Sequence, residues 1–295
     1  MSKFTGRAFV VLFVIFDIVL IFFTLAHVNK EPVKSDIPDT AATSSAPATS
    51  DQDPYDFKPA TSTLVSSNAD GSLIFAVHGN CEGTVASASA VSANLGDQVR
   101  PALTKLVTTL AVVAQGDGKY AAVGTNAACD PVQVESADTG RTWTPASDIT
   151  LWYVDPVDVE TVHAPGKGAS KPGCTVTSLS DLGKDSAVVT CADGQLIGTD
   201  NGGSKWNALG RLDNIRVADF ESSKVGYALA KFQGCAGQEF TTTDGGATWT
   251  QGGCIAGDPA QGISAADGKL VAIVGSQLYR SDDQGKTWSQ PESAL

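Results

Sequence analysis

An acidic or amide residue, a glycine and a tryptophan recur at fixed spacing in this chain. Four segments share the pattern Ser/Thr, any residue, Asp/Asn, any residue, Gly, any residue, Thr/Lys, Trp; they are SADTGRTW (136–143), TDNGGSKW (199–206), TTDGGATW (242–249) and SDDQGKTW (281–288). A carboxylate held beside a turn could act as a general acid, a general base or a cation ligand. Because the same acid recurs in each segment, a single active site does not explain it.

These repeat motifs have a structural explanation. An eroded copy, SANLGDQV (92–99), keeps the Asn and the Gly, and the third positions of successive copies are 44, 63, 43 and 39 residues apart. A period near 40 residues is typical of repeat folds. We expect the acid to accept backbone N–H groups of a turn, the glycine to adopt positive φ and the tryptophan to be buried where repeats meet. The residues assigned this structural role are Asn94, Asp138, Gly140, Trp143, Asn201, Gly203, Trp206, Asp244, Gly246, Trp249, Asp283, Gly285 and Trp288.

Other candidate catalytic groups are sparse. Asp155, Asp158 and Glu160 form an acidic cluster near His163. Two carboxylates at a suitable separation could hydrolyse a glycoside, whereas a solvated loop or a calcium loop explains the same cluster. His78 ends an apolar run, which favours a core histidine. We predict no catalytic residue, no metal ion and no cofactor.

The cysteines indicate disulfide bonds. Their number is even and no pair has CxxC spacing, which favours disulfides in an oxidising compartment over zinc. All follow the N-terminal apolar segment; they are Cys81, Cys129, Cys174, Cys191, Cys235 and Cys254.

Residues 8–28 are almost entirely apolar. About 20 such residues cross a bilayer as a helix, so we predict one transmembrane helix; a cleaved signal peptide is the alternative. Lys3 and Arg7 before it place the N-terminus in the cytoplasm by the positive-inside tendency. Asp17 within it is a candidate contact with a partner helix, because buried membrane carboxylates are usually functional; a tolerated acid is the alternative.

The remaining chain divides into a linker and one domain. Residues 1–7 form the predicted cytoplasmic N-terminus, and residues 29–61 are rich in Pro, Ser, Thr, Ala and Asp, a composition that cannot bury a core. Residues 62–295 form the predicted extracytoplasmic domain of a single-pass cell-membrane protein. The net charge is −12 and this domain has no Lys/Arg cluster, which excludes nucleic acid as the expected partner.

Short β-like runs precede each motif. Nearly continuous apolar runs occupy 72–79, 119–124, 186–191, 225–232 and 269–275, and an alternating run follows each, such as TVASASA after the first. With a third strand upstream and a fourth starting at each tryptophan, every repeat is predicted to be a four-stranded antiparallel meander. Radial repetition of such units predicts an all-β propeller. Five blades are favoured; six result if the extra segment, 149–173, completes one.

The motif resembles the Asp-box, or bacterial neuraminidase repeat, of sialidases, sortilin-type receptors and photosystem II stability/assembly factors. The resemblance implies an Asp-box β-propeller, although the three arginines, Arg-Ile-Pro motif and Tyr/Glu pair of sialidases are absent. By analogy with the assembly factors, we expect a protein-binding accessory or assembly subunit of a membrane complex, such as a respiratory or other electron-transfer complex. The alternative is a cell-envelope glycan-binding or glycoside hydrolase-like protein.

Aligning the predicted blades places all six cysteines on one face. Six cysteines allow 15 pairings, and the alignment favours Cys81–Cys129, Cys174–Cys191 and Cys235–Cys254. Trp152 and Tyr153 lie in the extra segment, outside the motifs. They are candidate partner-binding residues, with packing of that segment onto the blades as the alternative.

Overall fold

The computed structural model of the chain describes residues 63–82, 85–86, 91–95, 98–102, 104–257 and 259–291. Residues 1–61, with the predicted transmembrane helix and Asp17, lie outside the described residues. Among the residues that are described, no helix is long and apolar enough to cross a membrane. The described part of the chain consists of strands and their connections.

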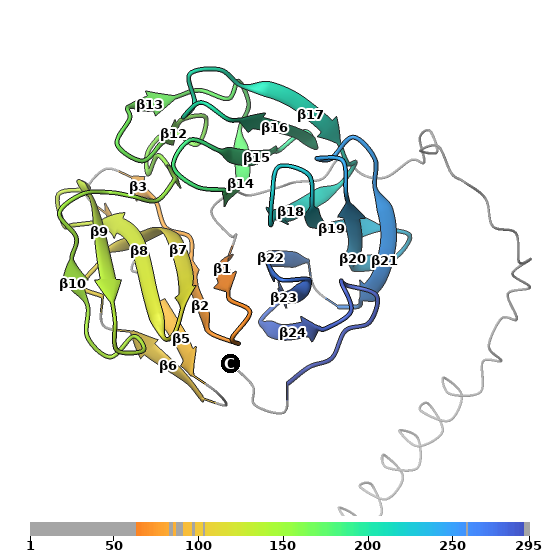
Figure 1. The fold of residues 1–295 in the computed structure, drawn as a ribbon, viewed down its shortest axis with the longest axis horizontal. Coiled ribbons are helices and arrows are strands. Elements are labelled where there is room, and N and C mark those ends of the chain that lie inside the picture. Colours follow the sequence, from red (N-terminus) through yellow and green to blue (C-terminus); the bar gives the residue numbers. More distant parts are fainter. Residues whose placement is uncertain are drawn as a thin grey trace, which may run out of the picture. The chain divides into compact units, whose positions relative to one another are not determined.

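Five antiparallel sheets surround a common axis and form a five-bladed β-propeller (Figure 1). Blade 1 contains β1 (Thr63–Ser67), β2 (Leu73–Val77), β5 (Val91–Leu95) and β6 (Gln98–Ala102). Blade 2 contains β7 (Thr108–Gly116), β8 (Lys119–Thr125), β9 (Pro131–Ser136) and β10 (Thr144–Pro145). Blade 3 contains β14 (Val176–Asp181), β15 (Ala187–Cys191), β16 (Gln195–Thr199) and β17 (Asn207–Arg211).

Blades 4 and 5 complete the ring. Blade 4 contains β18 (Ile215–Phe220), β19 (Gly226–Phe232), β20 (Cys235–Thr242) and β21 (Thr250–Ile255). Blade 5 contains β22 (Ala260–Ala266), β23 (Lys269–Val274) and β24 (Gln277–Ser281), and Ser289 bridges to Arg280 where a fourth strand is expected. The all-β propeller prediction is confirmed, because each apolar run is the second strand of a blade.

The extra segment between blades 2 and 3 forms a separate small sheet. Its strands are β11 (Tyr153–Val154), β12 (Val162–His163) and β13 (Ala169–Ser170), each two residues long. This sheet is too short to count as a blade, but β11 contacts both β7 and β14 and therefore occupies the ring between them. We call it the insertion sheet.

One strand expectation for blade 1 is wrong. Of the run TVASASA, the described residues Val85–Ala86 form β4 and pair with β3 (Cys81–Glu82), whereas the partner of β2 is β5, farther along the chain. Before reaching β5, the chain turns back through this hairpin of β3 and β4. The Cys81–Cys129 disulfide ties this hairpin to blade 2.

Side-chain oxygens on inner strands accept backbone N–H groups of a neighbouring inner strand or, in one case, of Trp152 ahead of the insertion sheet. These contacts join blades whose edges cannot form a continuous ladder, and they satisfy N–H groups that face the axis. The acceptors and donors are Ser66 and Ala114, Asp181 and Trp152, Ser180 and Phe220, Asp219 and Ala265, and Ser264 and Ser67, at 2.9–3.2 Å.

The motif tryptophans lie where blades meet. Trp143 of blade 2 packs on a core that includes Ile74 of blade 1. Trp249 of blade 4 packs on blade 3 residues and contacts Phe220 edge to face at 6.4 Å. Trp206 packs on the insertion-sheet core and Trp288 on the core between blades 4 and 5. Apolar burial between blades, at about 25 cal/mol per Å², therefore stabilises the ring.

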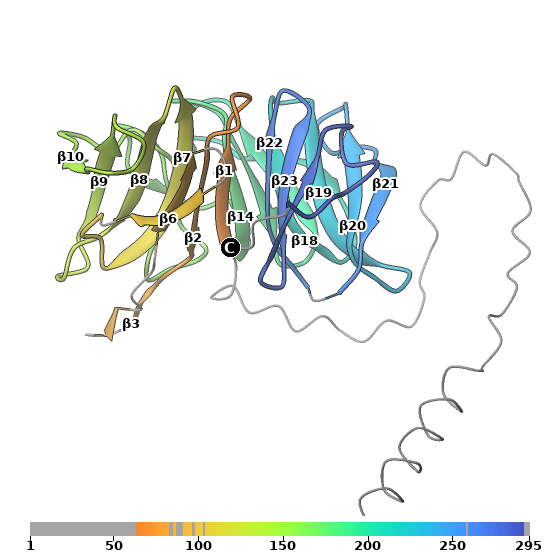
Figure 2. The same cartoon turned by 90° about the horizontal axis from the view of Figure 1, so that it is seen from below.

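The two faces of the propeller differ in construction. All the cysteines lie in turns after second strands or beside connections between blades, so we call that end the cysteine face. The turns from third to fourth strand carry the motifs at the opposite end, which we call the motif face. Figure 2 shows the ring from the side, with β3 at the edge that belongs to the cysteine face. The structure contains the three expected disulfides, Cys81–Cys129, Cys174–Cys191 and Cys235–Cys254.

Candidate functional site

The motif of blade 4 shows what the recurring acid does. Asp244 Oδ1 accepts the backbone N–H of Thr248 at 2.9 Å and Oδ2 accepts the Thr248 hydroxyl at 2.6 Å. The Thr242 hydroxyl donates to Asp244 at 2.8 Å and accepts the N–H of Gly246 at 2.8 Å. Gly246 has φ of 96°, in the left-handed region. The carboxylate thus closes its own turn.

The other motifs repeat this arrangement. Asp138 and Asp283 each accept the N–H and the hydroxyl of the threonine four residues later. Hydrogen bonds from that threonine hold the pKa of both carboxyls at about 2. Gly140, Gly203 and Gly285 have φ of 75°, 80° and 81°. The side chain of Asn94, in the eroded copy, lies outside the described side chains.

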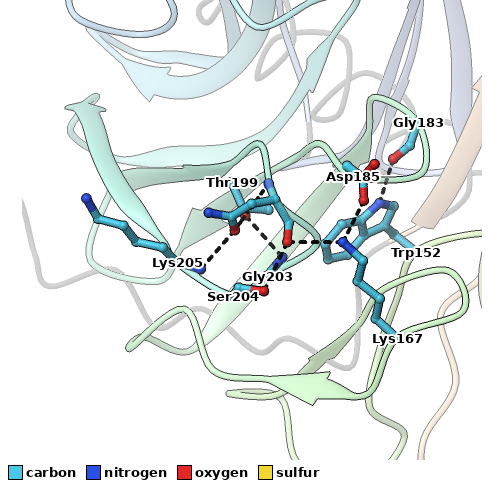
Figure 3. A network of polar contacts seen from close by, with 9 residues as sticks. Trp152, Lys167, Gly183, Asp185, Thr199, Gly203, Ser204 and Lys205 are labelled. Atoms are coloured by element: carbon cyan, nitrogen blue, oxygen red, sulfur yellow. Dashed lines mark hydrogen bonds and ion pairs between the residues drawn. The ribbon is translucent and has the colours of Figure 1, made fainter.

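Blade 3 carries the variant motif, in which the acid is an amide. Asn201 Oδ1 accepts the N–H of Lys205 at 2.9 Å. Figure 3 shows Lys167 of the loop after β12 reaching this turn: its Nζ lies 2.6 Å from Asp185 and 3.2 Å from the carbonyl oxygen of Asn201. This cation bridges the insertion sheet to blade 3.

The structure corrects the expectation of a partner surface at Trp152 and Tyr153. Their exposed fractions are 1% and 6%. Trp152 Nε1 donates to the carbonyl of Gly183 at 2.8 Å (Figure 3), and its ring meets Trp206 edge to face at 6.1 Å. Tyr153 stacks on His163 with centroids 4.6 Å apart. Both aromatic side chains therefore pack the insertion sheet against the rest of the propeller.

The acidic cluster of the insertion sheet is also engaged locally. Asp155 Oδ2 lies 2.8 Å from His163 Nε2, while its Oδ1 accepts the N–H groups of Val157 and Asp158. Asp158 bonds Lys171 at 3.0 Å, and that contact is the main cause of its pKa of about 2. The polar contacts of both carboxylates therefore lie within the extra segment, 149–173. Within the described ranges, no group of three or more His, Cys, Asp or Glu could hold a metal ion.

A cavity of about 510 Å³ occupies the centre of the ring. Its wall is formed mainly by inner strands β1, β7 and β14, with β18 and β22 contributing at the motif face. Apolar side chains such as Leu64, Leu110 and Val176 line the part nearer the cysteine face. The volume falls within the range of small-molecule sites.

Carboxyl groups gather at the motif-face end of this cavity. Asp181, Asp219, Glu221 and Asp267 line it where the inner strands end. The first three accept backbone N–H groups, and none of the four takes part in the ion pairs found among described residues. Burial raises the pKa of Asp219 to about 6 and raises the pKa of Asp181. Backbone N–H groups, and not cationic side chains, therefore stabilise the first three carboxylates.

His78 lines the opposite end of the cavity, directly after β2. Burial lowers its pKa to about 4, so the imidazole is neutral at neutral pH. The described residues supply its side chain with no hydrogen-bond partner. Its side chain is only partly buried, so its ring nitrogens need no protein partner.

Sequence reasoning favoured a satisfied core histidine at His78, whereas the side chain is partly exposed on the cavity wall, and it missed the acids at the other end. Asp181, Asp219, Glu221 and Asp267 sit at or just after the ends of different inner strands, far apart in the chain. An acid at the end of each predicted first strand was the available signal, because such ends converge around the axis.

No protein-family model matches the chain, and no curated protein matches it. Among solved structures, the SapL1 lectin in complex with alpha methyl fucoside is 13% identical over 81% of this chain and 97% of the lectin, with a TM-score of 0.51. YCF48 bound to D1 peptide is 16% identical over 81% of this chain and 72% of that chain, with a TM-score of 0.34. The GH74 xyloglucanase from Xanthomonas campestris is 15% identical over 77% of this chain and 38% of the enzyme, with a TM-score of 0.34. The likeness to the lectin concerns the propeller fold alone.

Proposed function

We propose that this chain is a membrane-anchored, extracytoplasmic propeller that binds a protein partner through its cysteine face, as an accessory or assembly subunit of a membrane complex. The apolar segment 8–28 supports the anchor, because about 20 such residues span a bilayer. The three disulfides support an oxidising compartment.

The observation that carries the proposal is where apolar surface is exposed. Val77 and Val157 are the large apolar side chains exposed among described residues, at 55% and 74%. Val77 ends β2, and Val157 follows Pro156, whose carbonyl accepts the N–H of Cys81 at 2.9 Å. Both valines therefore lie on the cysteine face, close to the Cys81–Cys129 disulfide.

Loop construction supports the same face. The motif face consists of similar turns whose polar groups bond within each turn, so it presents little that distinguishes one partner from another. On the cysteine face the loops differ in sequence and are fixed by disulfides. Fixed loops lose less entropy on binding, and exposed apolar groups with fixed neighbours are typical of binding surfaces.

A binding role also accounts for the carboxylates better than catalysis does. The motif acids and Asp181, Asp219 and Glu221 already accept backbone N–H groups that maintain the fold. Glycoside hydrolysis needs a pair of carboxyls that face a shared substrate and can exchange protons with it. We therefore propose that the chain is not an enzyme.

The test compares Val157→Asp and Val77→Asp with Ala247→Asp in the full-length protein. Ala247 is exposed on the motif face at a variable motif position, so its substitution introduces the same charge elsewhere. After crosslinking in native membranes, we expect the two valine variants to lose the partners of the wild type by about tenfold or more, since a charge in an apolar contact costs at least 1.4 kcal/mol. Ala247→Asp should retain them.

Two results would contradict the proposal. One is an unchanged set of crosslinked proteins in both valine variants. The other is capture of carbohydrate in place of protein, measured by binding of the same purified chains to immobilised glycans, which would favour the glycan-binding alternative.

A further inference from the structure

The contact between blades 4 and 5 encloses an ionisable side chain. Glu239 of β20 has an exposed fraction of 0%, and the Thr241 hydroxyl donates to its Oε1 at 2.7 Å. Its Oε2 has no hydrogen-bond partner among the described residues. Burial of an unpaired charge is strongly disfavoured, so this enclosure accepts the neutral acid and disfavours the carboxylate.

Glycines form the space that the carboxyl group occupies. A Cβ atom on Gly252 of β21, or on Gly285 of the blade 5 motif, would overlap it. Gly253, next to Gly252, donates its N–H to the carbonyl oxygen of Gly285 at 2.7 Å, so the same place carries a hydrogen bond between the two blades. We call Glu239, Gly252, Gly253 and Gly285 the blade 4–5 joint.

The preceding pair of blades has an apolar residue at the equivalent place. Leu196 lies three residues before the blade 3 motif, as Glu239 lies three residues before the blade 4 motif. Its side chain is fully buried and lies against Gly246 of the next motif, as Glu239 lies against Gly285. The architecture therefore accepts an uncharged side chain here, and ring closure itself does not require an acid.

Blade 5, which follows blade 4 in the ring (Figure 1), holds its motif through few contacts outside the turn itself. Among the described residues its fourth strand is the single bridge between Arg280 and Ser289, whereas β17 and β21 have five and six residues. The segment 281–289 is attached by that bridge, by Trp288 on the core between blades 4 and 5, and by the blade 4–5 joint. If the joint is lost, this segment can separate while the other blades stay folded.

We propose that the blade 4–5 joint is a pH-sensitive switch, closed while Glu239 is protonated and opened when its carboxyl group ionises, so that segment 281–289 separates from blade 4. The proton passes to solvent, and the new carboxylate must reach water because no donor satisfies its Oε2 in the closed joint. The inference goes beyond the proposed partner binding, since the joint lies between two blades and not on the cysteine face.

The groups around the joint leave the ionisation of Glu239 without a compensating cation. Tyr227 of β19 is buried, and its pKa is raised mainly by that burial, with Glu221 and Glu239 as smaller causes. In the blade 5 motif, Asp283 is bonded within its own turn and Lys286 is exposed. β21 contributes glycines, and the shared core residues of β22 and β23 are apolar. Burial raises the pKa of Glu239 to about 7, so the switch operates near neutral pH.

Fluorine NMR of the full-length protein in lipid nanodiscs, labelled with 5-fluorotryptophan, tests the switch. The chain has five tryptophans, and Trp288→Phe assigns the resonance at the joint. From about pH 5 to about pH 9 we expect the Trp288 resonance to shift with a midpoint near 7, while those of Trp143 and Trp206 stay unchanged. A Trp288 resonance that does not respond to pH would overturn the inference. Equal shifts of all the resonances would also overturn it, because they would report unfolding of the whole propeller.

Variants of Glu239 assign the titration. Glu239→Gln keeps a carbonyl for the Thr241 hydroxyl, and Glu239→Leu copies the residue of the preceding joint. Both should abolish the Trp288 shift, and the other resonances in the same spectrum show whether each variant is folded. Asp282→Asn, at an exposed position of the same motif, is the matched control and should retain the shift. A shift that persists in Glu239→Gln, or that disappears in the control, would contradict the switch.

Proteolysis measures the separation of the segment. Trypsin cleaves after Lys286 when the surrounding turn opens, and the rate follows the population of the open form. At about pH 8, one unit above the pKa of Glu239, we expect the wild type to be cleaved there at least about tenfold faster than Glu239→Leu. Equal rates would show ionisation without separation and would overturn the inference. None of these results depends on the valine variants that test partner binding.

Discussion

Glu239 should make the propeller less stable as the pH rises from 4.5 to about 7. It lies on β20 with an exposed fraction of 0%, and its Oε2 has no hydrogen-bond partner. Its Oε1 accepts the Thr241 hydroxyl at 2.7 Å. Burial raises its pKa from 4.5 to about 7. The equivalent buried positions, three residues before the other motifs, are Gln133, Leu196 and Leu278.

The magnitude follows from linkage between proton binding and folding. Below pH 4.5 the carboxyl is protonated in both the native and the unfolded chain, and it has no effect on stability. Between pH 4.5 and about 7 the unfolded chain releases the proton while the native chain retains it. The free energy of unfolding therefore falls across this window, by about 3 kcal/mol at about 1.4 kcal/mol for each pH unit. Above pH 7 this contribution is constant.

Glu239→Gln removes this titration and keeps a carbonyl for the Thr241 hydroxyl. We expect the variant to be more stable than the wild type by up to about 3 kcal/mol at pH 8 and equally stable near pH 4. Urea unfolding of the full-length protein, followed by tryptophan fluorescence from pH 4 to pH 8, measures the difference. Glu135→Gln, at an exposed position on β9, is the control.

The reasoning about Glu239 is refuted by either of two outcomes. The first is a variant that is no more stable than the wild type at pH 8. The second is a gain of equal size in Glu135→Gln, because a general reduction of negative charge would then explain both.

Three other predictions concern a disulfide, the motif tryptophans and the anchor. Serine at both Cys235 and Cys254, which are 19 residues apart, should lower the free energy of unfolding by about 3 kcal/mol; urea unfolding under oxidising conditions checks this. Trp143→Phe should cost about 1–2 kcal/mol more than Trp249→Phe in the same assay, because only the Trp143 indole N–H donates a hydrogen bond, whereas that of Trp249 is buried without a partner. Asp17→Leu should leave propeller unfolding unchanged but reduce co-purification with membrane partners, because a polar contact between membrane helices contributes about 1 kcal/mol; equal yields would make residues 8–28 a simple tether.

The blades were predictable from local sequence because each motif specifies its own turn. The acid, the glycine and the preceding Ser or Thr bond within eight residues, so the turn between third and fourth strands forms without help from the rest of the chain. Once those turns are placed, the alternation of strand direction assigns each cysteine to one face. Two disulfide pairs follow from that assignment and their short sequence separations of 17 and 19 residues, and Cys81–Cys129, across blades 1 and 2, is the pair that remains.

The insertion sheet and the cavity were not predictable in the same way. The sequence leaves Trp152 open between partner binding and packing onto the blades, because its indole N–H donates to the carbonyl of Gly183, 31 residues away. His78 and Asp219 face one cavity from strands that are separated by more than one hundred residues. No local pattern encodes such convergence. Glu239 could have been found, because alignment of the repeats places an acid where the other blades have glutamine or leucine.

The distribution of polar groups along the axis has one physical cause. Backbone N–H groups at the junctions between blades need acceptors, and in the interior the acceptors are hydroxyls: Ser66, Ser180 and Ser264. At the motif-face mouth of the cavity, where water is near, the acceptors include carboxylates such as Glu221. A carboxylate deeper in the propeller would be disfavoured, because its desolvation costs more free energy than one hydrogen bond contributes. Asp219 lies between the hydroxyl acceptors of the interior and the carboxylates of the mouth, and burial raises its pKa to about 6. Ring closure therefore concentrates negative charge at one mouth of the cavity, where solvent can reach it.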